Sequence, residues 1–323
     1  MESVTPADWW VREPLREVAS IVSHVNDAKA QLDDVEFCRK AFDALNLLWT
    51  RLYRFQRRNS QLRPEHLENR GDTASFEELL RVSLKPGDKA RALQSNDVEQ
   101  LVTLTPQVMT HDILRREDYD PSDIPATLRK KACEKHLELA NAYNRWNKEQ
   151  TLKLAERAVK KLADLLFVIR SNIQHGEKTP RGPDSEKVKR DQEVCHLARP
   201  VIQRLLSAIL GNPDQRLAVY GTLRRGQPNH SMLAKLDGKW RNAHVRGELI
   251  NRNGLQHFTW NVLGSKVAVE ILHSADLEAR WIDLDRFEGA SYRRIWIVAA
   301  GDRDELAVTN IYTSEDSASG SRS

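Results

Sequence analysis

Cysteine is scarce in this chain of 323 residues, which contains only Cys38, Cys133 and Cys195. No two of them form a CxxC pair, so the sequence supports neither a zinc ribbon nor a disulfide framework. An odd number of unclustered cysteines is typical of a protein in a reducing compartment. We therefore expect a cytoplasmic protein without a metal site.

Long apolar runs and a strong charge imbalance are missing as well. The apolar run at 162–169 (LADLLFVI) is far shorter than the roughly 20 residues that cross a bilayer. The N-terminus lacks the basic segment and apolar run of a signal peptide. With 50 Lys and Arg against 46 Asp and Glu, the formal net charge is only +4. This charge permits nucleic-acid binding without arguing for it, and we expect no association with a membrane.

The spacing of apolar residues changes near residue 212. Before it, apolar residues recur at three and four positions, as on amphipathic helices that face one core. We expect long helices over 12–31, 35–57, 126–146, 148–174 and 187–210, and shorter ones over 75–84 and 97–114. Breaks rich in Pro, Gly, Asp and Ser fall at 58–73, 84–89, 117–125 and 176–185.

After residue 215 the pattern shortens to β-branched and aromatic runs. We expect strands over 216–221, 245–250, 267–272, 294–300 and 307–313, and one helix over 274–289. A chain of this length suits two domains. The sequence predicts an α+β protein with an all-α bundle at 1–212. A small mixed β-barrel or sheet with one or two helices follows at 213–314, and a disordered tail at 315–323.

Two segments of the C-terminal part carry residues suited to acid–base chemistry. The run VYGTLRRGQPNH (219–230) follows a strand, and Gly221 allows a tight turn there. Consecutive backbone N–H groups of such a turn can hold a carboxylate or an oxyanion. The second run, LDRFEGASYRR (284–294), places Glu288 at the end of a helical segment.

Together these two runs resemble the γ-glutamyl cyclotransferase superfamily, and among its branches the γ-glutamylamine cyclotransferases most. The resemblance covers roughly 215–314. It implies that Glu288 is the general acid and base and that Tyr220, Gly221, Thr222 and Leu223 bind the substrate. Tyr292 and Arg293 would shape the pocket, although Arg293 can instead pair with Asp285. The family's usual Gly-Glu pair in a central strand reads Val269-Glu270 here.

The reaction that this resemblance implies needs no cofactor. A γ-glutamyl group carries its own nucleophile, the α-amine, at five-ring distance from the γ-carbonyl. Ring closure is favoured by proximity, expels an amine and yields 5-oxoproline. One carboxylate can make both proton transfers. The expected partner is thus a small γ-glutamyl molecule.

A second motif lies at the end of the helix over 148–174, where Arg170 and His175 are separated by four residues. Arg offers a fixed cation for a phosphate and His can move a proton near neutral pH. The segment, with Asn172, is similar to the HEPN superfamily of metal-independent ribonucleases, in which two subunits complete the active site. Alternatively, both side chains complement the helix macrodipole and cap its carbonyls.

Two functions therefore stay open at this point. The first is a γ-glutamyl cyclotransferase that releases 5-oxoproline from a γ-glutamyl amine or related conjugate. The alternative is a HEPN-type ribonuclease of a defence or toxin system, which uses Arg170 and His175 and carries the C-terminal domain as a γ-glutamyl sensor. The second predicts RNA as a partner and a homodimer formed through the helical domain.

Overall fold

The chain divides into two compact units, each of which draws on more than one segment. The computed structural model describes residues 6–59, 72–110, 126–174, 185–252, 255–302 and 305–314. The first unit comprises Met1–Trp9 and Asp27–Ile209, and the second comprises Trp10–Asn26 and Leu210–Ser323. No helix in these described ranges is long and apolar enough to cross a membrane.

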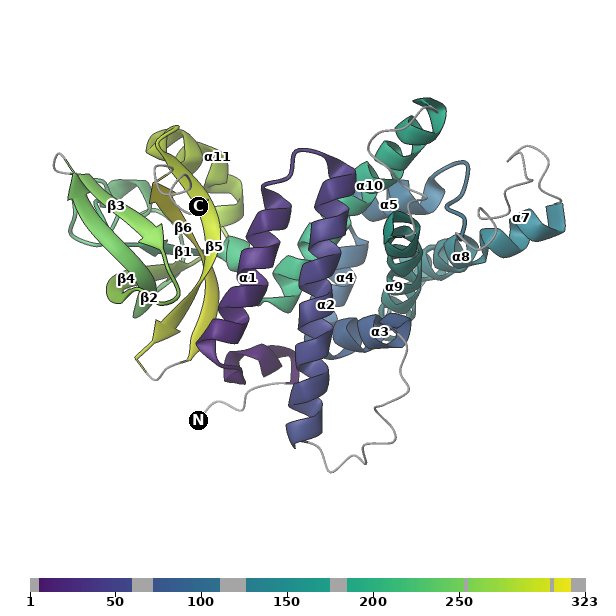
Figure 1. Ribbon diagram of the computed structural model, residues 1–323, viewed down its shortest axis with the longest axis horizontal. Helices are drawn as coiled ribbons and strands as arrows, with labels where there is room; N and C mark the ends of the chain where they lie inside the picture. Colours follow the sequence, from purple (N-terminus) through teal and green to yellow (C-terminus); the bar gives the residue numbers. More distant parts are fainter. Residues whose placement is uncertain are drawn as a thin grey trace, which may run out of the picture. The chain divides into compact units, whose positions relative to one another are not determined.

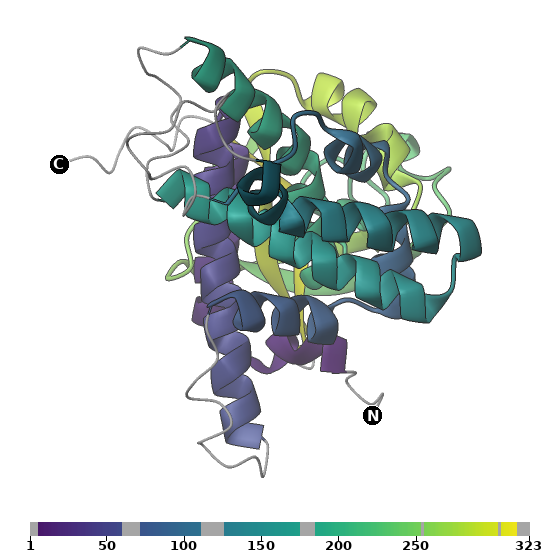
Figure 2. The same ribbon diagram turned by 90° about the vertical axis from the view of Figure 1, so that its right-hand side faces the viewer.

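The described residues of the first unit form helices and the turns that connect them, without a strand (Figure 1). Its helices are α2 (Asp34–Asn59), α3 (Asp72–Ser83), α4 (Pro86–Leu93), α5 (Asn96–Thr103), α7 (Ala126–Ala132), α8 (Glu134–Glu149), α9 (Leu152–Gln174) and α10 (Ser185–Ile209). Figure 2 shows α8 and α9 lying side by side. Gln150 connects them in a left-handed conformation, with its N–H bonded to the Trp146 carbonyl at 2.6 Å.

Most expected helices are present, with three differences. Helix α4 begins at Pro86 inside an expected break, because proline is well tolerated in the first turn of a helix. Helix α5 ends at Thr103 instead of continuing to 114, ahead of the Thr105-Pro106 sequence, since a residue before proline disfavours the α region. The single helix expected over 126–146 is divided into α7 and α8 at Cys133.

The second unit is built on a β-barrel. Its strands are β1 (Arg216–Val219), β2 (Lys239–Arg252), β3 (Leu255–Trp260), β4 (Ser265–His273), β5 (Tyr292–Gly301) and β6 (Leu306–Ser314). The sheet order is β3-β2-β4-β1-β6-β5, and pairing of β2 with β5 closes five of these described strands into a barrel. Only the β1–β6 pair is parallel among these pairings.

Strand β2 takes part in three pairings because it is long. Its first part pairs with β4 and its last part, from Gly247 onward, pairs with β3. A Cβ at Gly247 would lie 2.3 Å from the Thr259 carbonyl oxygen, so only glycine fits where the strand changes partner. Strand β3 was not expected from the sequence.

Apolar side chains fill the barrel and attach helix α11 (Leu277–Glu288) to it. Strand residues that include Val245, Val269 and Ile297 form the interior cluster. A second cluster joins Leu217 of β1 to Trp281 and Leu284 of α11. This packing fixes the C-terminal end of α11 beside the end of β1.

Helix α1 (Leu15–Lys29) begins in the barrel unit, since Trp10–Asn26 belongs to it. The Asn26 side chain donates to the Trp296 carbonyl at 2.7 Å and accepts from the Trp296 N–H at 3.0 Å. This amide therefore satisfies both backbone groups of one β5 residue. The expected domain boundary at 212 stays a prediction. The second compact unit is discontinuous in sequence, because it combines Trp10–Asn26 with Leu210–Ser323.

Candidate active site

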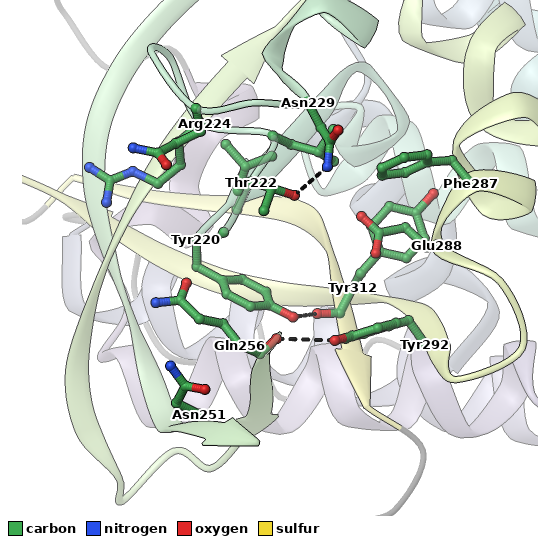
Figure 3. A pocket seen from close by; sticks show the side chains of 15 residues that line it. Tyr220, Thr222, Arg224, Asn229, Asn251, Gln256, Phe287, Glu288, Tyr292 and Tyr312 are labelled. Carbon is green, nitrogen blue, oxygen red and sulfur yellow. Dashed lines mark hydrogen bonds between the residues drawn. The ribbon is translucent and has the colours of Figure 1, made fainter. Parts of the chain in front are cut away.

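The turn after β1 folds back on itself through local hydrogen bonds. The N–H of Arg224 donates to the Gly221 carbonyl at 3.1 Å, and the N–H of Asn229 donates to the Thr222 carbonyl at 3.1 Å. The Asn229 side chain also donates to the Thr222 hydroxyl at 3.0 Å (Figure 3). Within the described chain, no hydrogen bond uses the N–H groups of Gly221, Thr222 or Leu223. These groups are thus available to a ligand oxygen.

Glu270 of β4 holds this turn against the barrel. Its carboxylate accepts the backbone N–H of Arg225 at 2.9 Å and the guanidinium of the same residue at 3.0 and 2.8 Å. Burial alone would raise the pKa of Glu270, but these hydrogen bonds and the charges of Arg225 and Arg224 outweigh it and lower the pKa. The Glu of the Val269-Glu270 pair is therefore an ionised anchor for the turn.

A cavity of about 510 Å³ opens between this turn and the end of α11. Its lining residues come from β1, the turn, β2, β3, α11, β5 and β6 (Figure 3). They are Ala218, Val219, Tyr220, Gly221, Thr222, Leu223, Arg224, Gln227, Asn229, Asn251, Gln256, Phe287, Glu288, Tyr292 and Tyr312. A cavity of this size matches those that hold small molecules.

Glu288 is the last residue of α11 and reaches the cavity because the helix stops there. Gly289 follows with φ +68°, a conformation that favours glycine and ends the helix. Burial raises the pKa of Glu288 from its ordinary value of 4.5 to about 7. Its carboxyl group has no hydrogen bond or ion pair with the described residues. It can therefore bind and release a proton near neutral pH.

Three tyrosines surround Glu288 and are held in place by hydrogen bonds. Tyr220 donates to the Tyr312 carbonyl at 3.0 Å, and Tyr292 donates to the Gln256 carbonyl at 3.2 Å (Figure 3). Tyr312 donates to Asp285 at 2.7 Å. Burial is the main cause that raises the pKa of each tyrosine, so all three stay neutral near pH 7.

Six of the residues predicted for this site line the cavity: Tyr220, Gly221, Thr222, Leu223, Glu288 and Tyr292. Arg293 does not line it and is exposed. Side chains alternate along a strand, so Tyr292 and Arg294 share one face of β5 and Arg293 lies on the other. The pairing considered for Arg293 and Asp285 was wrong, because Arg294 holds Asp285 at 2.9 and 3.1 Å.

Several other lining residues were not predicted from the sequence. Tyr312 is on the last strand, and Asn251 and Gln256 are on β2 and β3. None belongs to a local motif, so only the barrel closure brings them to Glu288. Phe287 and Arg224, in contrast, are neighbours of predicted residues and could have been named with them.

The second candidate site lies in the helical unit. Arg170 is buried, with its guanidinium 5.0 Å from the Phe167 ring and 5.6 Å from the Trp49 ring, and 3.4 Å from Asp72. The buried side chain of Asn172 donates to the Met109 carbonyl at 2.9 Å. His175 lies outside the described residues. The ribonuclease activity, the RNA partner and the homodimer therefore stay predictions.

Comparison with known proteins finds a family match for the C-terminal part of the chain. Residues 217–322 match the family described as gamma-glutamyl cyclotransferase, AIG2-like. No curated protein matches the chain. YkqA of Bacillus subtilis is 22% identical with a TM-score of 0.27, over 31% of this chain and 36% of that one. The chain thus spans about a third of that protein's length.

Two further solved structures are similar over the same share of the chain. An uncharacterized protein of Pyrococcus horikoshii is 22% identical, with a TM-score of 0.24, over 31% of this chain and 76% of that one. An AIG2-like protein of Mus musculus is 24% identical, with a TM-score of 0.26, over 31% of this chain and 77% of that one. On the family match, residues 217–322 form a domain of the γ-glutamyl cyclotransferase, AIG2-like family.

Proposed function

We propose that the barrel unit is a γ-glutamyl cyclotransferase, which releases 5-oxoproline from a γ-glutamyl amine or related conjugate. One observation carries the proposal: Glu288 is a partly buried carboxyl group with a pKa near 7, without an ion pair among the described residues, in the wall of a cavity. A perturbed carboxyl in a cavity is typical of general acid–base catalysis.

The first step is attack of the substrate's α-amine on its own γ-carbonyl carbon. The ionised form of Glu288 accepts a proton from the α-ammonium group, which leaves the nitrogen lone pair free to attack. A C–N bond forms and the carbonyl oxygen becomes an oxyanion. The N–H groups of Gly221, Thr222 and Leu223 are the available donors for that oxygen.

The second step breaks the original γ-amide bond. Glu288, now protonated, gives its proton to the departing nitrogen, and the oxyanion electrons re-form the carbonyl. The second α-ammonium proton follows the same route, so the amine leaves as an ammonium ion and the ring nitrogen keeps one hydrogen. A carboxyl with a pKa near 7 suits both transfers, because it is present in both forms at neutral pH.

The surrounding side chains support this role for Glu288. Neutral tyrosines at 220, 292 and 312 enclose the carboxyl in an apolar wall that still carries hydroxyl groups. Their burial keeps the local dielectric constant low, which strengthens the oxyanion contacts. None of these steps calls for a redox group, since no electrons are exchanged with a cofactor.

A 5-oxoproline assay by mass spectrometry tests the proposal. Purified protein is incubated with γ-glutamyl amines, γ-glutamyl amino acids and glutathione. We expect release of 5-oxoproline from at least one of them, and a loss of about 10³-fold or more in Glu288→Gln, as for removal of an essential acid and base. Glu248→Gln, the same change at an exposed position of β2, should retain activity. If the folded wild-type protein releases no 5-oxoproline from any substrate of the panel, the proposal is wrong.

A further inference from the structure

The hydroxyl group of Tyr292 can act toward a ligand only as a hydrogen-bond acceptor. Its single proton is already used, because it donates to the Gln256 carbonyl at 3.2 Å and a carbonyl oxygen cannot donate in return (Figure 3). No other hydrogen bond joins this oxygen to the described residues. Since Tyr292 lines the cavity, a ligand group that binds its oxygen has to be a donor.

The other two tyrosines of the cavity wall do not offer a ligand the same oxygen. The Tyr220 hydroxyl donates to the Tyr312 carbonyl at 3.0 Å and also takes the backbone N–H of Phe258. The Tyr312 hydroxyl donates to the Asp285 carboxylate at 2.7 Å, and Tyr312 is only 4% exposed. Tyr292 is half-buried, so its oxygen is the accessible acceptor among the three.

Strand β3 fixes the position of this oxygen through two consecutive residues. Gln256 supplies the carbonyl that takes the hydroxyl proton, and the ring of His257 stacks on the ring of Tyr292, with centroids 5.5 Å apart and planes 13° apart. These contacts hold both the ring plane and the hydroxyl. Because the barrel closes through β2 and β5, β3 is not needed for closure and contributes instead to the cavity.

The charges around Tyr292 favour a positively charged donor. Burial raises the pKa of Tyr292, and the charge of Glu288 adds to this effect, so the two groups lie close enough to interact. Within the described chain the Glu288 carboxyl has no ion pair that would compensate its charge. Arg224, the cation among the lining residues, is on the opposite side of the cavity in Figure 3. An ammonium group complements both a carboxylate and a hydroxyl lone pair.

We propose that the oxygen of Tyr292 binds the α-ammonium group of the γ-glutamyl substrate and holds it beside Glu288. This inference rests on the proposed function, because it takes the ligand to be a γ-glutamyl molecule. After Glu288 has removed one proton, the amine still has N–H groups that donate to Tyr292. An acceptor leaves the nitrogen lone pair free to attack, whereas a free hydroxyl proton would bind that lone pair. The Gln256 carbonyl prevents this by holding the proton.

Two ligands that differ only in the amine test this contact. γ-Glutamylbenzylamide carries the α-ammonium group, and glutaric acid monobenzylamide has the same chain and carboxylate without it. Binding of both is measured by titration calorimetry in the Glu288→Gln background, where turnover does not interfere. Tyr292→Phe keeps the ring and removes the oxygen. We expect it to weaken γ-glutamylbenzylamide by about tenfold to a hundredfold, as for a hydrogen bond to a charged group, and to change the glutaryl ligand by less than about twofold.

Two further variants separate this contact from a structural effect. Tyr53→Phe, the same change at a half-buried position of α2, should affect neither ligand. Tyr220→Phe removes an oxygen that protein groups already use, so it should not distinguish the ligands. Equal losses for both ligands in Tyr292→Phe would mean that Tyr292 supports the wall or binds the carboxylate, and would overturn the inference. Unchanged binding of γ-glutamylbenzylamide, a selective loss in Tyr220→Phe instead, or no binding of either ligand would overturn it too.

Release of 5-oxoproline from γ-glutamyl compounds, measured with Glu288 intact, keeps this inference separate from the proposed function. Turnover with the same kcat/KM in Tyr292→Phe and wild type would retain the cyclotransferase and remove the ammonium contact. Selective binding of γ-glutamylbenzylamide that depends on Tyr292, without 5-oxoproline from any compound, would retain the contact and remove the cyclotransferase. A kcat/KM that falls by about tenfold or more in Tyr292→Phe, together with the selective loss of binding, supports both.

Discussion

The raised pKa of Glu288 has consequences for the stability of the protein as well as for the proposed reaction. Its pKa is about 7 in the folded protein and 4.5 ordinarily. Between these values the folded state holds more protons than the unfolded state, so the free energy of unfolding falls as pH rises. Burial of the charged form therefore costs stability, and the cost is complete above pH 7.

Replacing Glu288 by Gln should stabilise the protein at pH 8 and leave its stability nearly unchanged at pH 4, where the carboxyl is largely protonated in both states. The expected gain at pH 8 is up to about 3 kcal/mol, from about 1.4 kcal/mol for each unit of pKa. Chemical denaturation at both pH values measures it, with Glu248→Gln as the exposed control. A variant that is less stable than wild type at pH 8 would contradict the burial of a charge at this position.

The same pKa should appear in the kinetics. If Glu288 accepts the first proton, kcat/KM should rise with pH through about 7, because only the ionised carboxylate is a base. Rates of 5-oxoproline release from pH 5.5 to 8.5 provide the profile. Residual activity of Glu288→Gln should lack this rise, and a wild-type profile that stays flat over the range would argue against Glu288 as the base.

Residues of the site were predictable where they belong to a local motif. Glu288 and the Tyr220–Leu223 turn follow from two short runs of sequence. Tyr312 and Gln256 were not predictable, because their strands read like any other strand and only the barrel closure places them at the cavity. Arg293 and Arg294 are neighbours on β5, but their side chains lie on opposite faces of the strand. Arg294 therefore pairs with Asp285, and Arg293 does not.

At the scale of elements, the turn after β1 depends on β4. The Glu270 carboxylate is the strongest described link between them, with hydrogen bonds to Arg225 at 2.9 and 3.0 Å. Glu270→Gln keeps the size of the side chain. It loses the negative charge and one of the two oxygens that accept hydrogen bonds from Arg225. We expect kcat/KM to fall by about tenfold, the effect of one charge-assisted hydrogen bond.

Hydrogen exchange of the 220–230 segment should become faster in Glu270→Gln, since the turn opens more readily. The exposed Glu278 of α11 provides the matched control, Glu278→Gln. If activity falls while hydrogen exchange of this segment is unchanged, then Glu270 does not affect activity by stabilising the turn.

Elements were predictable when their pattern was long and regular, as for α2, α9 and α10. Strand β3 was missed because its six residues, LQHFTW, mix polar and apolar side chains without a clear alternation. Helix α4 was missed because Pro86 and Gly87 read as a break, although proline is favoured in a first turn.

At the scale of the whole molecule, the barrel unit includes a helix from the other end of the chain. The sequence predicted α1 as an amphipathic helix but not its partner, because an apolar face does not specify what it packs against. The partner is specified by single polar contacts, such as the Asn26 amide on the backbone of Trp296.

A chain that begins at Asp27 should therefore have a less stable barrel. It lacks Trp10–Asn26 and so loses both Asn26 hydrogen bonds, which contribute about 1 kcal/mol each. Hydrogen exchange of the β5 segment around Trp296 should become faster, and Asn26→Ala should reproduce part of the effect. A chain that begins at Trp10 removes only residues of the other unit and serves as the control. Unchanged exchange of β5 in both variants would contradict a role for α1 in the barrel.

The Asn26–Trp296 contact also bears on how the protein is made. About 180 residues separate Asn26 from Leu210, where the chain returns to the barrel unit. At a synthesis rate of about 5–20 residues per second, α1 waits on the order of ten to forty seconds before the first strand emerges. During that time the ribosome delivers the entire helical unit, which can fold first. The barrel, whose last described strand ends at Ser314, is thus completed only when α1 meets strands that are synthesised long after it.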